Sequence, residues 1–328
     1  MTEKKRIVSG MRPTGLLHIG NLHGALLNWA EMQSDYDCFF FIADWHALTS
    51  AYEDTNAIPE YVKDMMIDWL SAGLSPDKCT LFVQSRIKEH AELFLILSMI
   101  TPVPWLERNP TYKDQIAQLT GKDLSTFGFL GYPVLQAADI IIYKANKVPV
   151  GIDQVPHVEI TREIARRFNF LYKNVFPEPE SILTPTSKML GFDRRKMSKS
   201  YNNAIYLSDS PKDIGAKVAK MITDPSRARR SDPGNPDVCN VFDYHKLYTD
   251  HETFMDIMSQ CRNASIGCVD CKKIMAKSLT KYLEPVREKR AYYQARPDIV
   301  SDIIISGSNK AQKIARQTMV EVRGAVNI

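Results

Sequence analysis

One apolar stretch limits the folds open to this chain more than any other feature of its sequence. The residues Cys38-Phe39-Phe40-Phe41-Ile42-Ala43 form a continuous apolar run of strand length. A strand with apolar side chains on both faces needs cover on both faces, which is typical of parallel sheets flanked by helices. The run therefore predicts a central strand buried between two helical layers.

The first half of the chain alternates between strand-like and helix-like segments. Strands are expected at residues 6–9, 38–43, 80–83 and 148–151, and helices at 19–33, 58–72, 89–100, 134–144 and 154–169. This order predicts an α/β fold with a doubly wound, Rossmann-like parallel sheet. Ligands of such folds bind at the carboxyl ends of the strands, so functional residues are expected there.

The pattern changes after residue 170. Prolines 177, 179 and 185 interrupt the next segment, which reads as a linker, and beyond Pro211 the pattern is almost entirely helical, with helices expected at 213–222, 241–260, 271–295 and 298–322. We expect a Rossmann-like catalytic domain over residues 1–187, a linking loop over 188–205 and a helical domain over 206–328. The last helix is a candidate to pack back on the catalytic domain.

Charge and hydropathy exclude some partners. The chain has 42 Lys and Arg residues against 38 Asp and Glu residues, and its net charge of +4 is too small to indicate a nucleic-acid partner by itself. No run of 18 uncharged apolar residues occurs, and no apolar signal segment follows the charged N-terminus. We therefore expect no membrane partner and a cytoplasmic location.

Two short segments carry the strongest functional signals. The first is Gly10-Met11-Arg12-Pro13-Thr14-Gly15-Leu16-Leu17-His18-Ile19-Gly20-Asn21, between the first expected strand and helix. Glycines let a nucleotide approach the backbone closely, and a helix N-terminus offers N–H groups and a positive dipole end to phosphate. His18 and Asn21 stand three residues apart, so both can reach one ligand. Taken alone, the segment could equally be a tight turn with a surface histidine.

The second segment is Lys196-Met197-Ser198-Lys199-Ser200. Two ammonium groups and two hydroxyls on one loop suit a pyrophosphate leaving group, because they can neutralise charge that develops in the transition state. By itself, a solvated basic loop is the simpler interpretation. Together, the two segments resemble the paired signatures of class I aminoacyl-tRNA synthetases, although the usual signature has a second histidine where Asn21 stands.

The middle of the chain narrows this resemblance. Gly131-Tyr132-Pro133-Val134-Leu135-Gln136-Ala137-Ala138-Asp139, Val148-Pro149-Val150-Gly151-Ile152-Asp153-Gln154 and the segment from His157 to Glu163 closely resemble bacterial tryptophanyl-tRNA synthetases. The resemblance covers nearly the whole chain. One departure is Gln136, where many relatives have methionine and the tyrosyl enzymes have glutamine.

The residues make physical sense for tryptophan. Tyr132, Gln136 and Asp139 are spaced i, i+4, i+7 and therefore share one helical face. The only polar group of indole is its N–H, and a buried carboxylate such as Asp139 is a suitable acceptor for it. The alternative, a charge on the helix surface, fits poorly with the apolar neighbours Ala137, Ala138, Ile140, Ile141 and Ile142.

The resemblance also implies residue roles, substrates and partners. It assigns catalysis to His18, Asn21, Lys196 and Lys199, and tryptophan binding to Asp139, Tyr132, Gln136 and Gln154. It assigns ATP contacts to Arg12, Pro13, Thr14, Gly20, Asn21, Gly151, Ile152, Asp153, Met189, Lys196, Met197, Ser198, Lys199 and Ser200. The implied ligands and partners are ATP with Mg²⁺, L-tryptophan, tRNA(Trp) and a second copy of the chain.

Four cysteines lie close together late in the chain. Cys239, Cys261, Cys268 and Cys271 have the spacing C-x(21)-C-x(6)-C-x(2)-C. Four thiolates can bind tetrahedral Zn²⁺ or a [4Fe-4S] cluster, and the ligand set alone does not decide between them. Residues 261–271 closely resemble the branch of tryptophanyl-tRNA synthetases that carries an iron–sulfur cluster, which implies [4Fe-4S] with zinc as the alternative. The other two, Cys38 and Cys79, are expected to be buried in or beside core strands.

The segment that follows the cysteines is basic. Residues 272–296 contain eight Lys or Arg against two acids, with three tyrosines among them. Positive charge follows phosphates and aromatic rings stack on unpaired bases, so this is a candidate surface for the anticodon. A helix with one solvated basic face is nearly as good an interpretation.

Three other functions stay open at this point. The chain could be the tyrosine-specific relative, another nucleotidyl transferase with the His18 segment, or a non-charging RNA-binding paralogue. The Lys196–Ser200 loop and the long helical tail argue against the second, and the intact phosphate segments together with Asp139 argue against the third.

Overall fold

The computed structural model describes residues 4–109, 125–184 and 189–328. The chain divides into two compact units. The first unit comprises Met1–Gly15, Gly24–Thr186 and Tyr293–Ile328, and the second comprises Leu16–His23 and Ser187–Tyr292. The domain boundary predicted at residues 187 and 188 lies outside the described residues. None of the helices in the described ranges is both long and apolar enough to cross a membrane.

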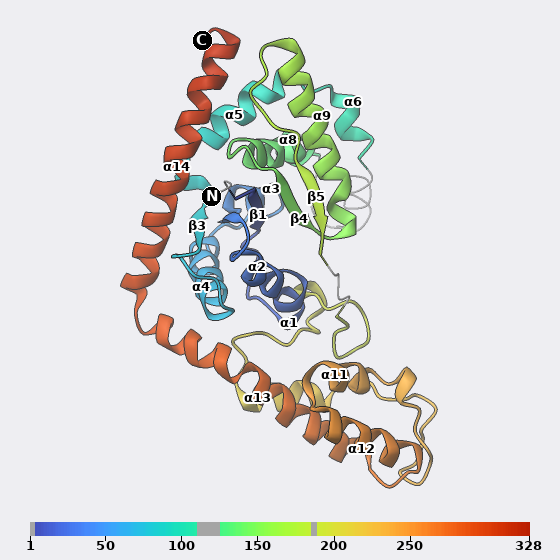
Figure 1. Cartoon of the computed structure of the whole chain (residues 1–328). Coiled ribbons are helices and arrows are strands. Elements are labelled where there is room, and N and C mark those ends of the chain that lie inside the picture. The colour runs from blue at the N-terminus through green and yellow to red at the C-terminus, as the bar shows by residue number, and fades with distance from the viewer. Residues whose placement is uncertain (1–3, 110–124, 185–188) are drawn as a thin grey trace. The chain divides into compact units, whose positions relative to one another are not determined.

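The first unit is built on a parallel sheet of five strands in the order β3-β2-β1-β4-β5 (Figure 1). The strands are β1 (Arg6–Met11), β2 (Asp37–Ile42), β3 (Cys79–Val83), β4 (Lys147–Val150) and β5 (Glu180–Leu183). The strand order reverses at β1, as in doubly wound folds. The predicted fold class is therefore confirmed.

The apolar run after Asp37 is a strand covered on both faces. Phe39 stacks on Tyr143, with ring centroids 5.1 Å apart, and Phe40 stacks on Trp29 at 4.5 Å. Neighbouring side chains of a strand point to opposite faces, so these two pairs mark two layers of packing. The burial of every residue in Cys38–Ile42 follows from this arrangement.

Eight α-helices of the described part of the first unit surround the sheet or join its strands. They are α2 (Leu27–Met32), α3 (Asp44–Ala51), α4 (Ile58–Ser71), α5 (Glu89–Ser98), α6 (Val103–Glu107), α8 (Phe127–Ile141), α9 (Val155–Leu171) and α14 (Pro297–Val326). Two short helical turns, Gln84–Arg86 and Ile152–Gln154, accompany them. The helix expected from residue 134 begins earlier, at Phe127. Thr126 caps it by accepting a hydrogen bond from the backbone N–H of Phe129, and Pro133 lies inside it.

One strand contradicts the sequence prediction. Glu180–Leu183 was expected to be part of a linker because prolines flank it, but it pairs with β4 as the edge strand β5. Prolines are compatible with an edge strand, where one side of the backbone needs no partner in the sheet.

The second unit is mainly helical. Its helices are α1 (Ile19–Asn21), α10 (Pro211–Ala219), α11 (Asn240–Tyr248), α12 (His251–Arg262) and α13 (Cys268–Gln294). The single helix expected at 241–260 is two helices, because Asp250 caps α12 by accepting from the backbone N–H of Thr253. The expected helix at 19–33 is likewise interrupted, by a π-helical turn at Leu22–Leu26. Such turns occur frequently at functional sites.

Helix α14 lies along β3 and α5 within the first unit (Figure 1). The approach depends on Gly307, because a Cβ at this position would lie 1.9 Å from the carbonyl oxygen of Leu81 in β3. Ion pairs of Arg316 with Glu89 and of Arg323 with Glu92 join α14 to α5.

We expect the Gly307→Ala substitution to lower the free energy of unfolding by about 2 kcal/mol or more, because the strand backbone has no room for a methyl group. Gly324 is the matched control. It lies on the same helix with open space around its Cβ position, so Gly324→Ala should raise stability by about 0.5–1 kcal/mol. Urea titrations measure both changes, and equal effects would contradict the close packing.

Candidate functional site

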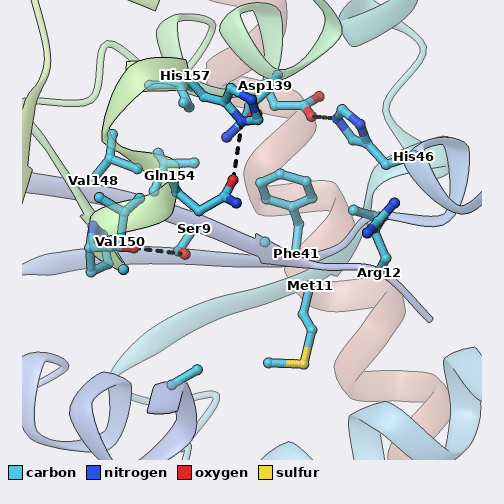
Figure 2. Close-up of a pocket in the computed structure, with 18 of the residues that line it drawn as sticks. Ser9, Met11, Arg12, Phe41, His46, Asp139, Val148, Val150, Gln154 and His157 are labelled. Atoms are coloured by element: carbon cyan, nitrogen blue, oxygen red, sulfur yellow. Dashed lines mark hydrogen bonds and ion pairs between the residues drawn. The ribbon is translucent and has the colours of Figure 1, made fainter. Parts of the chain in front are cut away.

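A pocket opens at the carboxyl ends of β1 and β4 in the first unit. Its volume is about 350 Å³, within the usual range for small-molecule sites. It lies at the point where the strand order reverses, which is where doubly wound folds bind ligands. Figure 2 labels part of its wall, namely Ser9, Met11, Arg12, Phe41, His46, Asp139, Val148, Val150, Gln154 and His157. Tyr132, Gln136 and Gly151 also line it.

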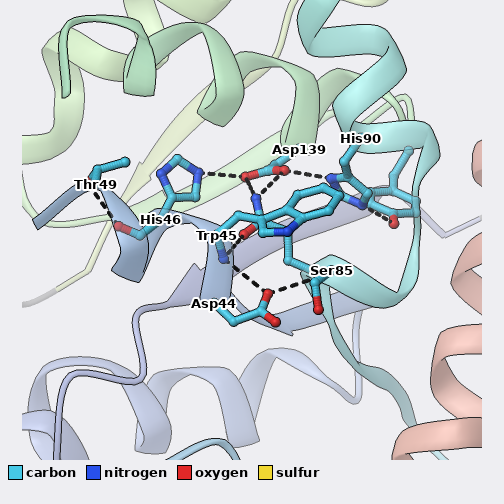
Figure 3. Close-up of polar contacts among 9 residues, drawn as sticks. Asp44, Trp45, His46, Thr49, Ser85, His90 and Asp139 are labelled. Carbon is cyan, nitrogen blue, oxygen red and sulfur yellow. Dashed lines mark hydrogen bonds and ion pairs between the residues drawn. The ribbon is translucent and has the colours of Figure 1, made fainter. Parts of the chain in front are cut away.

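Asp139 is the fully buried acid of this pocket, and three side chains bond to its carboxylate (Figure 3). The Nε2 atom of Gln84 lies 2.8 Å from both carboxylate oxygens. His46 reaches one oxygen through Nε2 at 2.8 Å, and His90 reaches the other through Nδ1 at 2.5 Å. Burial alone raises the pKa of Asp139, but the interactions with His46 and His90 outweigh it and lower the pKa below its usual value.

Two further contacts fix the direction of these bonds. The backbone N–H of Trp45 donates to Oε1 of Gln84 at 3.2 Å, which leaves the amide nitrogen to face Asp139. The hydroxyl of Tyr143 bonds to Nε2 of His90 at 2.6 Å, so both ring nitrogens of this histidine have a partner. The carboxylate is therefore held ionised and in one orientation.

A second cluster of polar side chains, made of Tyr132, His157 and Gln154, forms another part of the pocket wall. The hydroxyl of Tyr132 lies 2.9 Å from Nε2 of His157. Nδ1 of His157 lies 3.1 Å from Oε1 of Gln154, a contact that Figure 2 shows. Burial lowers the pKa of His157 to about 4 and raises the pKa of Tyr132 to about 12. Both groups are therefore neutral near pH 7.

Arg12 brings a positive charge to the pocket wall. Its side chain is open to the space of the pocket, yet the surrounding protein lowers the pKa of its guanidinium by desolvation. A guanidinium stays charged at any ordinary pH. The pocket thus combines a negative group, a positive group and apolar walls.

In the second unit, His18 begins α1 and is fixed by Asn21. Nδ1 of His18 accepts from the backbone N–H of Asn21 at 3.3 Å, and Oδ1 of Asn21 accepts from the backbone N–H of His18 at 3.0 Å. Burial and the charge of Lys199 lower the pKa of His18 to about 4. The neutral ring therefore carries its proton on Nε2, where it can be donated to a ligand.

One buried asparagine shapes the Lys196–Ser200 loop. Oδ1 of Asn203 accepts from the backbone N–H of Ser198 at 2.8 Å, and its Nδ2 donates to the carbonyl oxygen of Lys196 at 3.2 Å. Asn203 is fully buried, and Met197 is buried beside it in the loop. The lysine side chains are thus carried on an ordered backbone.

The Lys196–Ser200 loop lies beside the segment that contains His18 and Gly20. A Cβ on Gly20 would lie 3.7 Å from the sulfur of Met197, and the backbone N–H of Met197 donates to the carbonyl oxygen of Met189 at 3.0 Å. The backbone of Ile19 also bonds to Ile205, just beyond the loop. Two segments far apart in the sequence therefore meet within the second unit.

The residues predicted from the sequence fall into two sets. In the first unit, Arg12, Tyr132, Gln136, Asp139, Gly151 and Gln154 line the pocket. Pro13, Thr14, Ile152 and Asp153 belong to the same unit but are not among the described residues that line it. The second unit holds His18, Gly20, Asn21, Met189 and Lys196–Ser200.

The sequence interpretation missed the side chains that hold Asp139. Gln84 directly follows the carboxyl end of β3, and His46 lies in α3, which begins shortly after the carboxyl end of β2; both positions were usable signals. His90 and Tyr143 carried no such signal, because only the folded chain brings them to Asp139.

A comparison with family models gives the relationship of the chain. The family described as tRNA synthetases class I (W and Y) matches residues 1–284. The chain belongs to this family.

Individual relatives of the chain extend over its whole length. A protein of Thermotoga maritima named tryptophan–tRNA ligase is 54% identical over 325 residues, which cover 98% of this chain and 99% of its own length. A protein of the same name from Aquifex aeolicus is 45% identical over 393 residues, covering 98% of this chain and 100% of its own length. The predicted family is confirmed, and the predicted activity is the one that these names carry.

A solved structure agrees with this result. The crystal structure of tryptophanyl-tRNA synthetase from Campylobacter jejuni, complexed with ADP and tryptophan, matches with a TM-score of 0.91 at 33% identity. The match covers 98% of this chain and 100% of the other. The class I synthetase fold is thereby confirmed.

The four late cysteines of this synthetase line one small cavity in the second unit. The guanidinium of Arg227 lies 3.9 Å from the sulfur of Cys261 and 3.8 Å from that of Cys268. Burial and the neighbouring cysteines raise the pKa of Cys271 to about 12. Over the described ranges, no group of three or more His, Cys, Asp or Glu is arranged to hold a metal ion. Cys38 and Cys79 are buried, and burial raises the pKa of each to about 12.

We expect the Gln84→Leu substitution to lower the free energy of unfolding by about 1–3 kcal/mol at pH 7, because it removes a donor from a buried carboxylate. The pKa of Asp139 is depressed in the folded state, so this contribution is fully present above the ordinary value of 3.8. It is lost as the pH falls through the lower folded-state pKa.

Gln33→Leu is the control for this experiment. Gln33 is a buried glutamine of the same unit that bonds only neutral groups, among them the carbonyl oxygen of Gly73 and the backbone N–H of Ser75. The loss of free energy of unfolding caused by Gln33→Leu should be independent of pH. Urea titrations between pH 7 and pH 3 compare the two variants, and a parallel pH dependence would argue against the Asp139 network.

Proposed function

We propose that the chain is a tryptophan–tRNA ligase. The carboxylate of L-tryptophan attacks the α-phosphorus of ATP to give tryptophanyl-adenylate and pyrophosphate, and the aminoacyl group then passes to the 3′ end of tRNA(Trp). The observation that carries the proposal is the buried carboxylate of Asp139 in an apolar pocket, in a chain of the class I (W and Y) family.

Asp139 is the acceptor that we assign to the indole N–H. Three side-chain nitrogens bond to the carboxylate, and the amide nitrogen of Gln84 spans both oxygens, so we propose that the indole N–H adds a further donor to this ionised group. A ligand without a donor would leave this charge poorly paired, which is costly in a buried site. We assign Tyr132, Gln136 and Gln154 to the rest of the amino acid because they line the same pocket.

We assign ATP to the residues that the family resemblance names. Arg12 supports this assignment by its charge, and His18 supports it as a neutral ring with an Nε2 proton to donate. The other assigned contacts are Pro13, Thr14, Gly20, Asn21, Gly151, Ile152, Asp153, Met189 and Lys196–Ser200. Asn21 contributes by holding His18, since its side-chain oxygen bonds to the backbone of that residue.

The chemistry of the first step needs positioning and charge neutralisation rather than a protein nucleophile. ATP enters as its Mg²⁺ complex, in which the metal has few protein ligands. The departing pyrophosphate gains negative charge, and we assign its neutralisation to the ammonium groups of Lys196 and Lys199. Interactions that strengthen as this charge develops increase the rate.

We also propose that Cys239, Cys261, Cys268 and Cys271 hold a [4Fe-4S] cluster, with zinc as the alternative. Four sulfur donors that line one cavity provide the ligand chemistry that either group needs. Cys239 precedes α11, Cys261 lies in α12, and the other two lie in α13. The group would therefore tie three helices together, which is a structural role.

The remaining partners follow from the same proposal. Helix α13 exposes Lys273, Lys277, Lys281 and Lys289 as a basic surface for tRNA(Trp), whereas Arg290 is buried. We propose a homodimer in the cytoplasm, and exposed apolar residues such as Met99 and Phe127 offer a surface that a second copy can cover. Sedimentation velocity at micromolar concentration measures this assembly.

The activity is tested by exchange of labelled pyrophosphate into ATP with each of two amino acids. Tryptophan should support exchange, and tyrosine should support at least about a hundredfold less, because its phenol does not place a donor where indole does. Charging of tRNA(Trp) with tryptophan completes the test. Exchange that prefers tyrosine would assign the chain to the tyrosine-specific relative instead.

We expect the Lys199→Ala substitution to slow adenylate formation by about a hundredfold while tryptophan binding changes little. The reason is that Lys199 is proposed to meet charge that appears only in the transition state. Single-turnover kinetics and equilibrium binding of tryptophan measure the two quantities. Equal losses in rate and affinity would contradict the role.

The cysteine proposal is tested by metal and sulfide analysis of protein purified without oxygen. We expect about four iron atoms and four sulfide ions per chain and a brown colour. The Cys268→Ser variant should lose most of its iron and most of its sulfide. Cys38→Ser is the control, because that cysteine lies in β2 and should leave the iron content unchanged. Colourless protein with stoichiometric zinc would reverse the choice, and protein with neither metal would contradict the site.

A further inference from the structure

A row of polar contacts runs into the tryptophan pocket from the turn that precedes α9. Nε2 of Gln154 donates to a carboxylate oxygen of Asp153 at 3.1 Å. Oε1 of Gln154 lies 3.1 Å from Nδ1 of His157, and Nε2 of His157 lies 2.9 Å from the hydroxyl of Tyr132. Gln154, His157 and Tyr132 line the pocket, and Figure 2 shows the contact between the first two.

The direction of each hydrogen bond in this row follows from the one before it. An ionised carboxylate only accepts, so Asp153 selects the amide nitrogen of Gln154 and leaves the amide oxygen for His157. An amide oxygen also only accepts, so Nδ1 of His157 must carry the proton. In a neutral imidazole the other nitrogen then has a lone pair, and the hydroxyl of Tyr132 must donate to it.

The surroundings of His157 keep it neutral. The side chain is buried, and this burial lowers its pKa to about 4. The positive charge of Arg12 and the neighbouring His46 act in the same direction, and only Asp153 opposes them. Protonation would make both nitrogens donors and would reverse the hydroxyl of Tyr132.

We propose that His157 is a positioning residue that holds the Tyr132 hydroxyl with its oxygen lone pairs toward the pocket, and so selects a ligand that carries an ammonium group there. This rests on the proposed placement of tryptophan beside Tyr132. An α-amino acid offers an ammonium donor next to a carboxylate acceptor. The phenol oxygen accepts from the first, and Arg12, which acts electrostatically on Tyr132, suits the second.

The test compares tryptophan with indole-3-propionate, which is the same molecule without its amino group. Calorimetric titration gives the dissociation constant of each ligand for the parent and for His157→Phe. The variant keeps a ring of similar size but frees the hydroxyl of Tyr132 to turn. We expect tryptophan affinity to fall about tenfold and indole-3-propionate affinity to stay the same.

Two further variants separate this role from a structural one. His157→Gln keeps one donor and one acceptor and should retain most of the preference for tryptophan. Thr161→Val, whose hydroxyl bonds only to the backbone carbonyl oxygen of His157, changes the packing on α9 without changing the polarity of the row. It should leave the ratio of the two affinities unchanged. If His157→Phe does not fold, His157→Leu provides the same test, since it also removes the ring nitrogen that accepts from the hydroxyl of Tyr132.

An equal loss of affinity for both ligands in His157→Phe, or no loss for either, would overturn the positioning role. Tyr132→Phe distinguishes this failure from a failure of the proposed site. If that variant binds tryptophan as the parent does, the amino acid does not lie beside Tyr132. If it binds tryptophan weakly while His157→Phe binds normally, only the role of His157 is wrong.

Discussion

A fully buried carboxylate sets the strictest condition in this structure. Asp139 on α8 would cost several kcal/mol if its charge were left unpaired, and it is compensated by side chains from three other elements. His46 comes from α3, Gln84 from the turn after β3, and His90 from α5. These elements must therefore converge on α8 for the first unit to fold, and their convergence forms one end of the pocket.

The same condition explains how the pocket can recognise its substrate. The carboxylate of Asp139 and the phenol of Tyr132 are each held by hydrogen bonds to neighbours before any ligand arrives, so little reorganisation is needed on binding. The walls between them are apolar, as an indole ring requires. In the second unit, Asn21 holds His18 and Asn203 holds the Lys196–Ser200 loop in a comparable way. The carboxylate of Asp139, the ring of His18 and the backbone of the lysine loop are thus each fixed by polar neighbours.

Much of the fold could be predicted from the sequence, because apolar periodicity reports burial directly. The run after Asp37, the alternation of strand-like and helix-like segments, and the His18 and Lys199 segments are local patterns. Predictions failed where tertiary contacts overrule local ones, as in the strand Glu180–Leu183 between prolines and in the helix that passes through Pro133. His90 could not be predicted, since it lies 49 residues from Asp139 in the chain and does not directly follow the end of a strand.

The central claim is that Asp139 accepts a hydrogen bond from the indole N–H. It is tested most directly by comparing tryptophan with its benzothiophene analogue, in which sulfur replaces the N–H, for binding to the parent and to Asp139→Asn. We expect the parent to prefer tryptophan by about a hundredfold or more and the variant to lose most of this preference. The same preference in both proteins, or none in the parent, would contradict it.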